Sequence, residues 1–185
     1  VESSEPKMDK IENEKCPMCQ KNTLTLYEAE QDIPHFGKVF LFGMNCSDKE
    51  CNYKQNDVEV EKQGEPSKIE FTISNSKDLN VRVVKSSEAT VKIPQLRMEV
   101  EPGVASDGYV SNIEGILQRF KKILELERDA ADENTVRKKA KNLLKRLWHV
   151  ECGDEELKIV IEDPSGNSAI ISEKAVITSL KGKKK

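Results

Sequence analysis

The sequence is poor in aromatic residues and contains no long hydrophobic run. Aromatic residues make up 5% of the 185 residues, so the chain can build only a modest hydrophobic core. No apolar stretch approaches the roughly 20 residues that cross a bilayer. The polar beginning, VESSEPKMDKIENEK, lacks the apolar region of a signal peptide. We therefore expect a cytoplasmic protein without a membrane span, made of one domain and a small module or of one larger domain.

Histidine is also scarce, and this scarcity bears on enzymatic function. The chain has two histidines, His35 and His149. A metal-dependent oxygenase or a cupin enzyme needs two histidines and a carboxylate that converge on an open metal. Neither histidine lies on an expected strand of the second domain, and the sequence has no glycine-rich phosphate loop and no recognisable catalytic triad. We predict that the protein is not an enzyme.

An excess of positive charge is missing as well. The 30 basic and 33 acidic residues give a net charge of −3, which argues against bulk attraction to nucleic acid or anionic lipid. One basic segment, RKKAKNLLKR at residues 137–146, could contact phosphates. Such a run is more often a solvated helix face, so a nucleic-acid-binding zinc-ribbon protein that uses this face stays an alternative function.

Four of the five cysteines form two close pairs. Cys16 and Cys19 are spaced as Cys-x-x-Cys, and Cys46 and Cys51 as Cys-x4-Cys. In a reducing cytosol such pairs are more often metal ligands than disulfides, and an odd total fits a disulfide framework poorly. Because four sulfur ligands leave no open coordination position, we predict one structural Zn²⁺ ion. Two disulfides or four ordinary buried thiols are the alternatives, and we interpret Cys152 as a core or surface residue.

Residues beside the cysteines support the zinc-ribbon interpretation. Pro17 presets φ for a tight turn, which would direct backbone amides towards the thiolates. Asn52 follows Cys51, where a positive φ is expected, and asparagine is the non-glycine residue that best tolerates that conformation.

Hydrophobic periodicity divides the chain into two structured parts. We expect a disordered tail at residues 1–13, a four-cysteine zinc ribbon at 14–62, a β domain at 63–180 and a basic tail at 181–185. Alternating residues predict two ribbon strands joined by the turn DIPHFG. After the linker KQGEPSK the period stays near two, which predicts a β-sandwich, a barrel or a double-stranded β-helix.

A helical hairpin is expected within the β domain, at about residues 111–149. Ser111 and Glu114 have the spacing of a capping box. Apolar residues then recur on one helical face: Ile113, Ile116, Leu117, Phe120, Ile123 and Leu124. A second helix begins near Asn134, with a stripe of Val136, Ala140, Leu143, Leu144 and Leu147. Because alternation resumes at Leu157, the hairpin is predicted to be an insertion in the β domain.

Several phrases in order resemble the ZPR-type zinc-finger family, in the single-module form typical of archaea. They are CPMC, DIPHFGKV, CNYKQNDVE, RVVKSSEATVKIPQL, EPG and GYVSNIEGIL, between about residues 16 and 171. The chain departs from the family pattern at the second pair, usually Cys-x-x-Cys-Gly-Tyr, and at Gln95, where glutamate is usual. The resemblance implies a mainly β fold, in which a zinc ribbon precedes a jelly-roll-like double-stranded β-helix that carries a helical hairpin.

The resemblance also implies a function. Eukaryotic relatives bind translation elongation factor 1-alpha and assist its folding, so we expect a monomeric zinc-binding adaptor or dedicated chaperone of that GTPase. The family phrases place the zinc ligands at Cys16, Cys19, Cys46 and Cys51. They place candidate partner-binding residues at Asp32, Ile33, His35, Phe36, Arg82, Lys85, Ser86, Glu101 and Glu114.

Two other interpretations of these candidate residues stay open. At the hairpin tip, Phe36 could be an exposed anchor for a partner, or it could pack onto the β domain. Arg82, Lys85 and Glu101 could bind a partner or form only a surface ion-pair network, which would add little stability.

Overall fold

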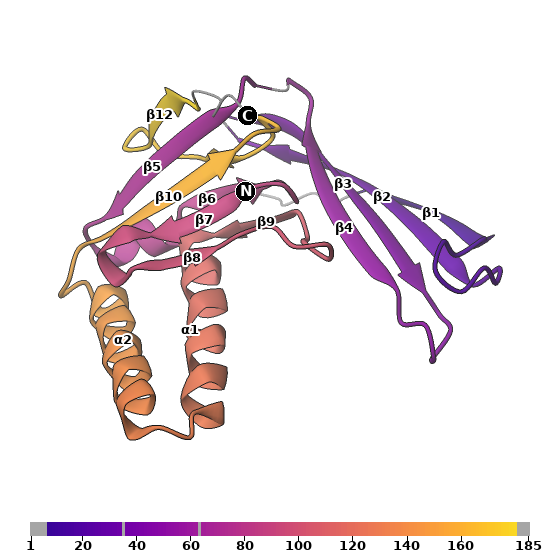
Figure 1. The fold of residues 1–185 in the computed structure, drawn as a ribbon. Coiled ribbons are helices and arrows are strands. Elements are labelled where there is room, and N and C mark those ends of the chain that lie inside the picture. The colour runs from indigo at the N-terminus through magenta and orange to yellow at the C-terminus, as the bar shows by residue number, and fades with distance from the viewer. Residues whose placement is uncertain (1–6, 35, 63, 181–185) are drawn as a thin grey trace.

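The structure is a computed structural model that describes residues 7–34, 36–62 and 64–180 (Figure 1). The ribbon is one antiparallel sheet with the strand order β1-β2-β3-β4. Its strands are β1 (Lys7–Glu14), β2 (Leu24–Ile33), β3 (Gly37–Cys46) and β4 (Lys54–Val60). The predicted hairpin is therefore present, with cysteines at its open end, and its strands extend into the expected turn as far as Ile33 and Gly37.

The second part of the chain is a jelly roll of two sheets. The larger sheet has the order β12-β5-β10-β7-β8, and the smaller has the order β11-β6-β9. Their strands are β5 (Ser67–Ile73), β6 (Arg82–Lys85), β7 (Thr90–Ile93), β8 (Met98–Val100), β9 (Tyr109–Asn112), β10 (Leu157–Asp163), β11 (Ala169–Ile170) and β12 (Val176–Ser179). Two short 3-10 helices, η1 (Ser76–Asn80) and η2 (Pro94–Leu96), connect strands.

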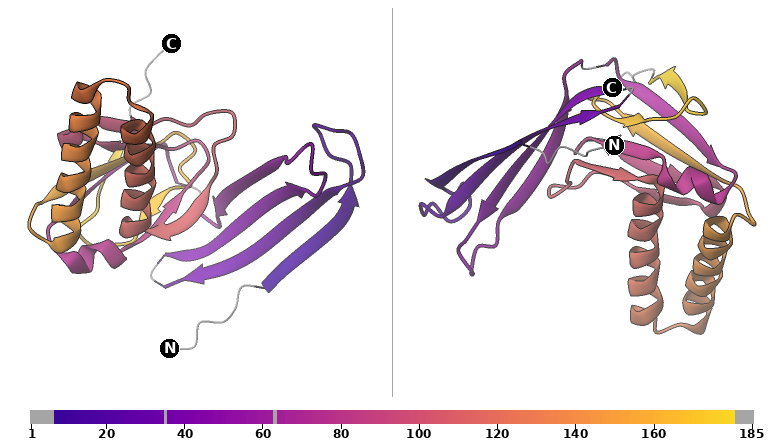
Figure 2. Two further views of the ribbon diagram at one scale, coloured as in Figure 1. Left: turned by 90° about the horizontal axis from the view of Figure 1, so that it is seen from below. Right: turned by 180° about the vertical axis from the view of Figure 1, so that it is seen from behind.

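The helical hairpin projects from the jelly roll (Figure 2). It consists of α1 (Ile113–Ala130) and α2 (Asn134–Cys152), and the chain then returns to the sheet in β10, which pairs with β5 and β7. The predicted insertion is confirmed. The apolar stripe of α1 and Leu143, Leu144 and Leu147 of the α2 stripe join the main core with Phe71, Ile93 and Ile159 from the strands, whereas Val136 and Ala140 of α2 lie outside that cluster. Ile123 is the exception on α1, because it is 45% exposed. Within the described residues, no helix combines the length and apolar character that a membrane crossing requires.

A smaller apolar cluster joins the ribbon to the jelly roll. Ile33, Val39 and Val58 from the ribbon sheet are buried in one cluster with Val84 and Ala169 from the smaller jelly-roll sheet. Polar contacts flank this cluster. The Asp57 carboxylate accepts from the Ser87 hydroxyl at 2.8 Å, and the Asp107 carboxylate accepts from the Asn56 amide nitrogen at 2.9 Å. The orientation of the ribbon sheet is therefore set by both apolar and polar contacts.

Two expectations about chain ends and caps were wrong. Residues 7–13 of the expected disordered tail belong instead to β1, whose backbone pairs with β2 from Lys7 opposite Glu30 to Glu14 opposite Leu24. Residues 1–6 and 181–185 lie outside the described residues. The N-cap of α1 is Asn112, whose side-chain oxygen accepts from the Gly115 amide at 2.8 Å. Ser111 is still part of β9, where it pairs with Val83.

Candidate metal centre

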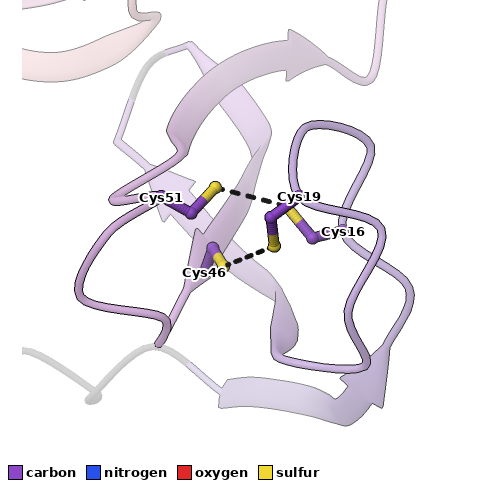
Figure 3. A group of neighbouring side chains, drawn as sticks. All are labelled: Cys16, Cys19, Cys46 and Cys51. Atoms are coloured by element: carbon purple, nitrogen blue, oxygen red, sulfur yellow. Dashed lines mark hydrogen bonds between the residues drawn. The ribbon is translucent and has the colours of Figure 1, made fainter.

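The four paired cysteines converge at one end of the ribbon sheet. Cys16 and Cys19 lie in the loop between β1 and β2, Cys46 is the last residue of β3, and Cys51 lies in the loop before β4. Figure 3 shows their side chains pointing towards one another. Cys16 and Cys46 are buried, and their cluster includes Leu24. Segments that are 35 residues apart in the chain thus supply ligands to one point.

The distances between the sulfur atoms fit a single tetrahedral ion. The Sγ atoms of Cys16 and Cys51 are 3.8 Å apart, and those of Cys19 and Cys46 are also 3.8 Å apart. All four Sγ atoms lie within 4.8 Å of one another. A tetrahedron with Zn–S bonds of about 2.3 Å has edges of about 3.8 Å, so the two shorter separations match opposite edges of a zinc site. The four cysteines are positioned to bind a metal ion.

Backbone amides around the cage also point at the sulfurs. The amide of Lys21 donates to Cys19 Sγ, and the amide of Tyr53 donates to Cys51 Sγ. Each of these loops contains a residue with positive φ: Gln20 at 62° and Asn52 at 48°. The positive φ predicted for Asn52 is confirmed. Gln20 has no such sequence signal, because glutamine is not a residue typical of left-handed backbone.

The thiols themselves show why a cation suits the cage. The Lys21 amide lowers the pKa of Cys19 to about 7. At Cys51 the Tyr53 amide alone would lower the pKa, but burial and the neighbouring cysteines outweigh it and raise the pKa to about 12. Four thiolates cannot ionise together at this spacing without a positive charge among them, and a divalent ion supplies that charge.

Side chains outside the cage form hydrogen bonds and an ion pair with the two cysteine loops. The Thr23 hydroxyl lies 3.1 Å from Cys46 Sγ and 3.8 Å from Cys19 Sγ. The Lys21 ammonium pairs with the Asp48 carboxylate, which connects the first loop to the second. Cys152 is exposed at the end of α2, away from the cage. Because all four coordination positions are sulfur, the centre is suited to hold structure rather than to activate water.

Comparison with known proteins agrees with this geometry. Residues 10–66 match the ZPR1 zinc-finger domain, and residues 77–182 match the ZPR1 jelly-roll domain. The chain belongs to the ZPR1 family. The predicted family, the zinc ribbon with a jelly roll, and the zinc cofactor are therefore confirmed.

Relatives with similar sequences are found in archaea and in eukaryotes. The chain is 38% identical over 167 residues to a ZPR1-like protein of Methanocaldococcus jannaschii, covering 90% of this chain and 83% of the relative. It is 37% identical over 172 residues to a ZPR1-like protein of Pyrococcus horikoshii, covering 91% and 76%. It is 32% identical over 159 residues to the zinc finger chaperone zpr1 of Schizosaccharomyces pombe, covering 84% of this chain but 33% of that protein.

The predicted partner-binding residues fall into two groups. Asp32, Arg82, Glu101 and Glu114 are exposed. Ile33, Lys85 and Ser86 are buried, with exposures of 4%, 5% and 2%. The side chains of Ile33 and Ser86 are therefore not placed to contact a partner at the surface, whereas Lys85 borders a groove beside α1. His35 lies outside the described residues.

The positions of Phe36 and Lys85 bear on the two alternatives for these candidates. Phe36 is 37% exposed and borders a groove that also includes Ile69 and Ala169 of the jelly roll, so it faces the second domain while remaining partly accessible. The expectation that Lys85 belongs to a surface ion-pair network was wrong, because its ammonium is buried and donates to backbone carbonyls.

A surface that the sequence reasoning missed lies on the outer face of the ribbon sheet. Ile11, Leu26, Phe42 and Met44 line a groove of about 430 Å³ there. Four carboxylates also line it, from Asp9, Glu28, Asp57 and Glu59, and its lining includes no lysine or arginine. The alternation of Phe40, Phe42 and Met44 in β3 was a signal of this face. Ile11 gave no such signal, because it was expected to lie in the disordered tail.

Proposed function

We propose that this ZPR1-family protein is a zinc-binding adaptor and dedicated chaperone that binds translation elongation factor 1-alpha and assists its folding. The eukaryotic relative named as a chaperone and the family resemblance motivate the choice of partner. In this proposal the protein acts as a monomer in the cytoplasm, where translation takes place, and it carries out no catalytic step of its own.

The observation that carries the proposal is the apolar outer face of the ribbon sheet. Phe42 is 37% exposed and Ile11 is 57% exposed on this face, although neighbouring side chains such as Leu26 are partly covered. Contiguous exposed apolar surface rimmed by polar residues marks sites where proteins bind one another. The cysteine cage and the apolar contact with the jelly roll both constrain this sheet, and a constrained binding surface loses less entropy on binding.

The charges on this face favour a protein over nucleic acid. Its carboxylates would repel phosphates, whereas nucleic-acid-binding surfaces carry clustered positive charge. The basic face of α2 is also partly committed within the protein. Arg137 donates to the Ala131 carbonyl, and Arg146 pairs with Glu155. The lysines of residues 137–146 are exposed, so the experiment must distinguish binding of nucleic acid from binding of the elongation factor.

The direct test is binding of the zinc-loaded protein to purified elongation factor 1-alpha with GDP, with GTP and without nucleotide. We expect a complex, and we expect Phe42→Ser to weaken it roughly thirtyfold, because a central aromatic anchor contributes about 2 kcal/mol or more. Ile177→Ser is the matched control, since Ile177 is 65% exposed on β12. Alanine substitutions at the exposed candidates Asp32, Arg82, Glu101 and Glu114 then test their proposed role.

A second measurement separates a folding helper from a stable subunit. Denatured elongation factor 1-alpha is diluted into buffer with or without the protein, and recovery of guanine-nucleotide binding is followed. A chaperone raises the recovered fraction and leaves free elongation factor at the end. The proposal fails if no complex forms in any nucleotide state, or if the protein binds RNA with a steep salt dependence and does not bind the elongation factor.

A further inference from the structure

A second groove runs along helix α1. It lies between α1 and residues 101–108, the segment that joins β8 to β9, and its volume is about 560 Å³. Figure 1 shows α1 directly beneath β8 and β9. Its apolar lining comes from Val91, Val100, Ile116, Phe120, Ile123 and Leu126. Ile123 is 45% exposed and Leu126 is 65% exposed, so the outer part of the groove presents aliphatic surface to solvent.

A buried lysine borders the same groove. Lys85 is 5% exposed, and its ammonium donates to the carbonyls of Ser86 at 2.8 Å and Asp107 at 3.4 Å. Both acceptors are neutral backbone groups. Burial lowers the pKa of Lys85, although the negative charges of Asp163, Asp57 and Asp107 act in the opposite direction. A buried ammonium without a carboxylate in direct contact is costly, because desolvation of the charge is only partly offset.

A second cation meets the lysine at one aromatic ring. The Arg119 guanidinium lies 3.9 Å from the centroid of the Tyr109 ring, and the Lys85 ammonium lies 5.6 Å from the same centroid. The Arg119 hydrogen bond within the protein is again to a carbonyl, that of Gly115, at 3.5 Å. Glu101 and Asp107 also line the groove, but among the described residues neither carboxylate makes a hydrogen bond or ion pair with Lys85 or Arg119; the Asp107 carboxylate accepts from the Asn56 backbone amide instead. Lys85 and Arg119 thus converge on the groove with backbone carbonyls as their hydrogen-bond acceptors, and Lys122 also lines it.

We propose that this groove binds a protein segment in which an acidic side chain is flanked by aliphatic side chains. The carboxylate lies against Lys85 and Arg119, and the aliphatic neighbours pack on Ile123 and Leu126. The apolar lining of α1 extends from Ile116 to Leu126, about 15 Å along the helix axis. That length accommodates about four or five extended residues, whereas a free phosphate or carboxylate ion would leave the aliphatic part uncovered. This site is separate from the ribbon-sheet face and does not depend on which partner binds there.

The test uses synthetic peptides and the isotope-labelled, zinc-loaded protein. Its amide NMR signals are followed during titration with the peptide Ac-Ser-Leu-Glu-Leu-Leu-Ser-NH₂ and with its glutamine counterpart. We expect signals from residues 101–108 and from α1 to shift, and the glutamate peptide to bind roughly tenfold more tightly than the glutamine peptide. Inorganic phosphate and acetate, titrated separately, should bind at least tenfold more weakly than the glutamate peptide.

Two variants test whether the charges of Lys85 and Arg119 cause the preference for the glutamate peptide. Lys85→Met keeps the aliphatic stem and removes the charge, and Arg119→Gln removes the charge of an exposed side chain. Each should reduce the affinity for the glutamate peptide about tenfold and leave that for the glutamine peptide unchanged. Lys145→Gln, on the exposed face of α2, is the control and should have no effect.

Several results would overturn the proposal. These are equal affinity for the two peptides, signal shifts confined to the ribbon, phosphate binding as tightly as the glutamate peptide, or no binding at millimolar peptide. If Lys85→Met fails to fold, Arg119→Gln still tests the proposal. The proposal requires that Arg119→Gln lose the preference for the glutamate peptide, and a retained preference would overturn it.

Discussion

Replacing Ile33 by alanine removes part of the contact between the zinc ribbon and the jelly roll. Ile33 is the last residue of β2 and is 4% exposed. It shares its cluster with Val39 and Val58 from the ribbon and with Val84 and Ala169 from the jelly roll. The family resemblance placed Ile33 among partner-binding residues. Its burial instead predicts an effect on stability.

The size of the effect follows from the atoms removed. Ile33→Ala deletes three buried carbon atoms, and at about 0.8 kcal/mol for each the lost transfer free energy is about 2.4 kcal/mol. The cavity left behind adds to this loss, so we expect the free energy of unfolding to fall by about 2–5 kcal/mol. Ile11→Ala is the matched control: Ile11 is 57% exposed on β1, and its truncation should change stability by at most about 0.5 kcal/mol.

The assay is a guanidinium titration at fixed free zinc, since zinc stabilises the folded state by mass action. Circular dichroism at 222 nm reports the helical hairpin of the jelly roll, and a zinc indicator reports opening of the cysteine cage. Because the Ile33 cluster joins the two parts, both transitions should move to lower denaturant in Ile33→Ala. A loss below about 1 kcal/mol, or a shift in only one of the two signals, would refute the reasoning about this interface.

Three other perturbations test individual sites. Asn52→Ala should destabilise the cysteine cage by about 1 kcal/mol in a zinc-release titration and Asn52→Gly should not, because φ is 48° at this residue; equal effects would count against a conformational cause. At Asp78, burial alone would raise the carboxyl pKa, but the Ser74 amide and the Lys174 ammonium lower it below its ordinary value of 3.8. Its ionised form therefore stabilises the fold above that value and loses the effect as the pH falls through the lowered pKa. Asp78→Asn should be less stable than the parent at pH 7 in thermal unfolding, and the difference should shrink below about pH 4; a difference that does not vary with pH would contradict this. Removal of zinc by a chelator should speed amide hydrogen exchange around the four cysteines and leave the ellipticity at 222 nm in native buffer unchanged, because the cysteine cluster is separate from the helical core and from the Ile33 cluster; loss of helix would show that the cage also stabilises the jelly roll.

The metal centre could be predicted from the sequence because its signal is local. The spacing of the cysteines fixes which residues can meet, and Asn52 marks a backbone conformation that few residues adopt. The helix stripes were likewise readable, since a period near 3.6 reflects one buried face. Residues on the second ribbon turn, including Cys51, agree with this interpretation despite the longer spacing.

The remaining features depend on contacts that are distant in the chain. The segment KMDKIENE has no regular alternation, and it becomes β1 because the edge of β2 provides hydrogen-bonding partners for its backbone. Ser111 matched a capping box, but pairing with Val83 keeps it in β9 and moves the cap to Asn112. Lys85 is charged and yet buried, because the backbone carbonyls of Ser86 and Asp107 accept its hydrogen bonds. No sequence pattern predicts that a backbone carbonyl will accept a hydrogen bond from a buried lysine.

The fold of the ribbon and the proposed function both depend on the cage formed by the four cysteines. X-ray absorption at the zinc edge, with elemental analysis of the same purified sample, measures both the ion and its ligands. We expect one zinc per chain, bound by four sulfur atoms at about 2.3 Å. A chain that contains no zinc, or a first shell in which nitrogen or oxygen replaces sulfur, would contradict this expectation.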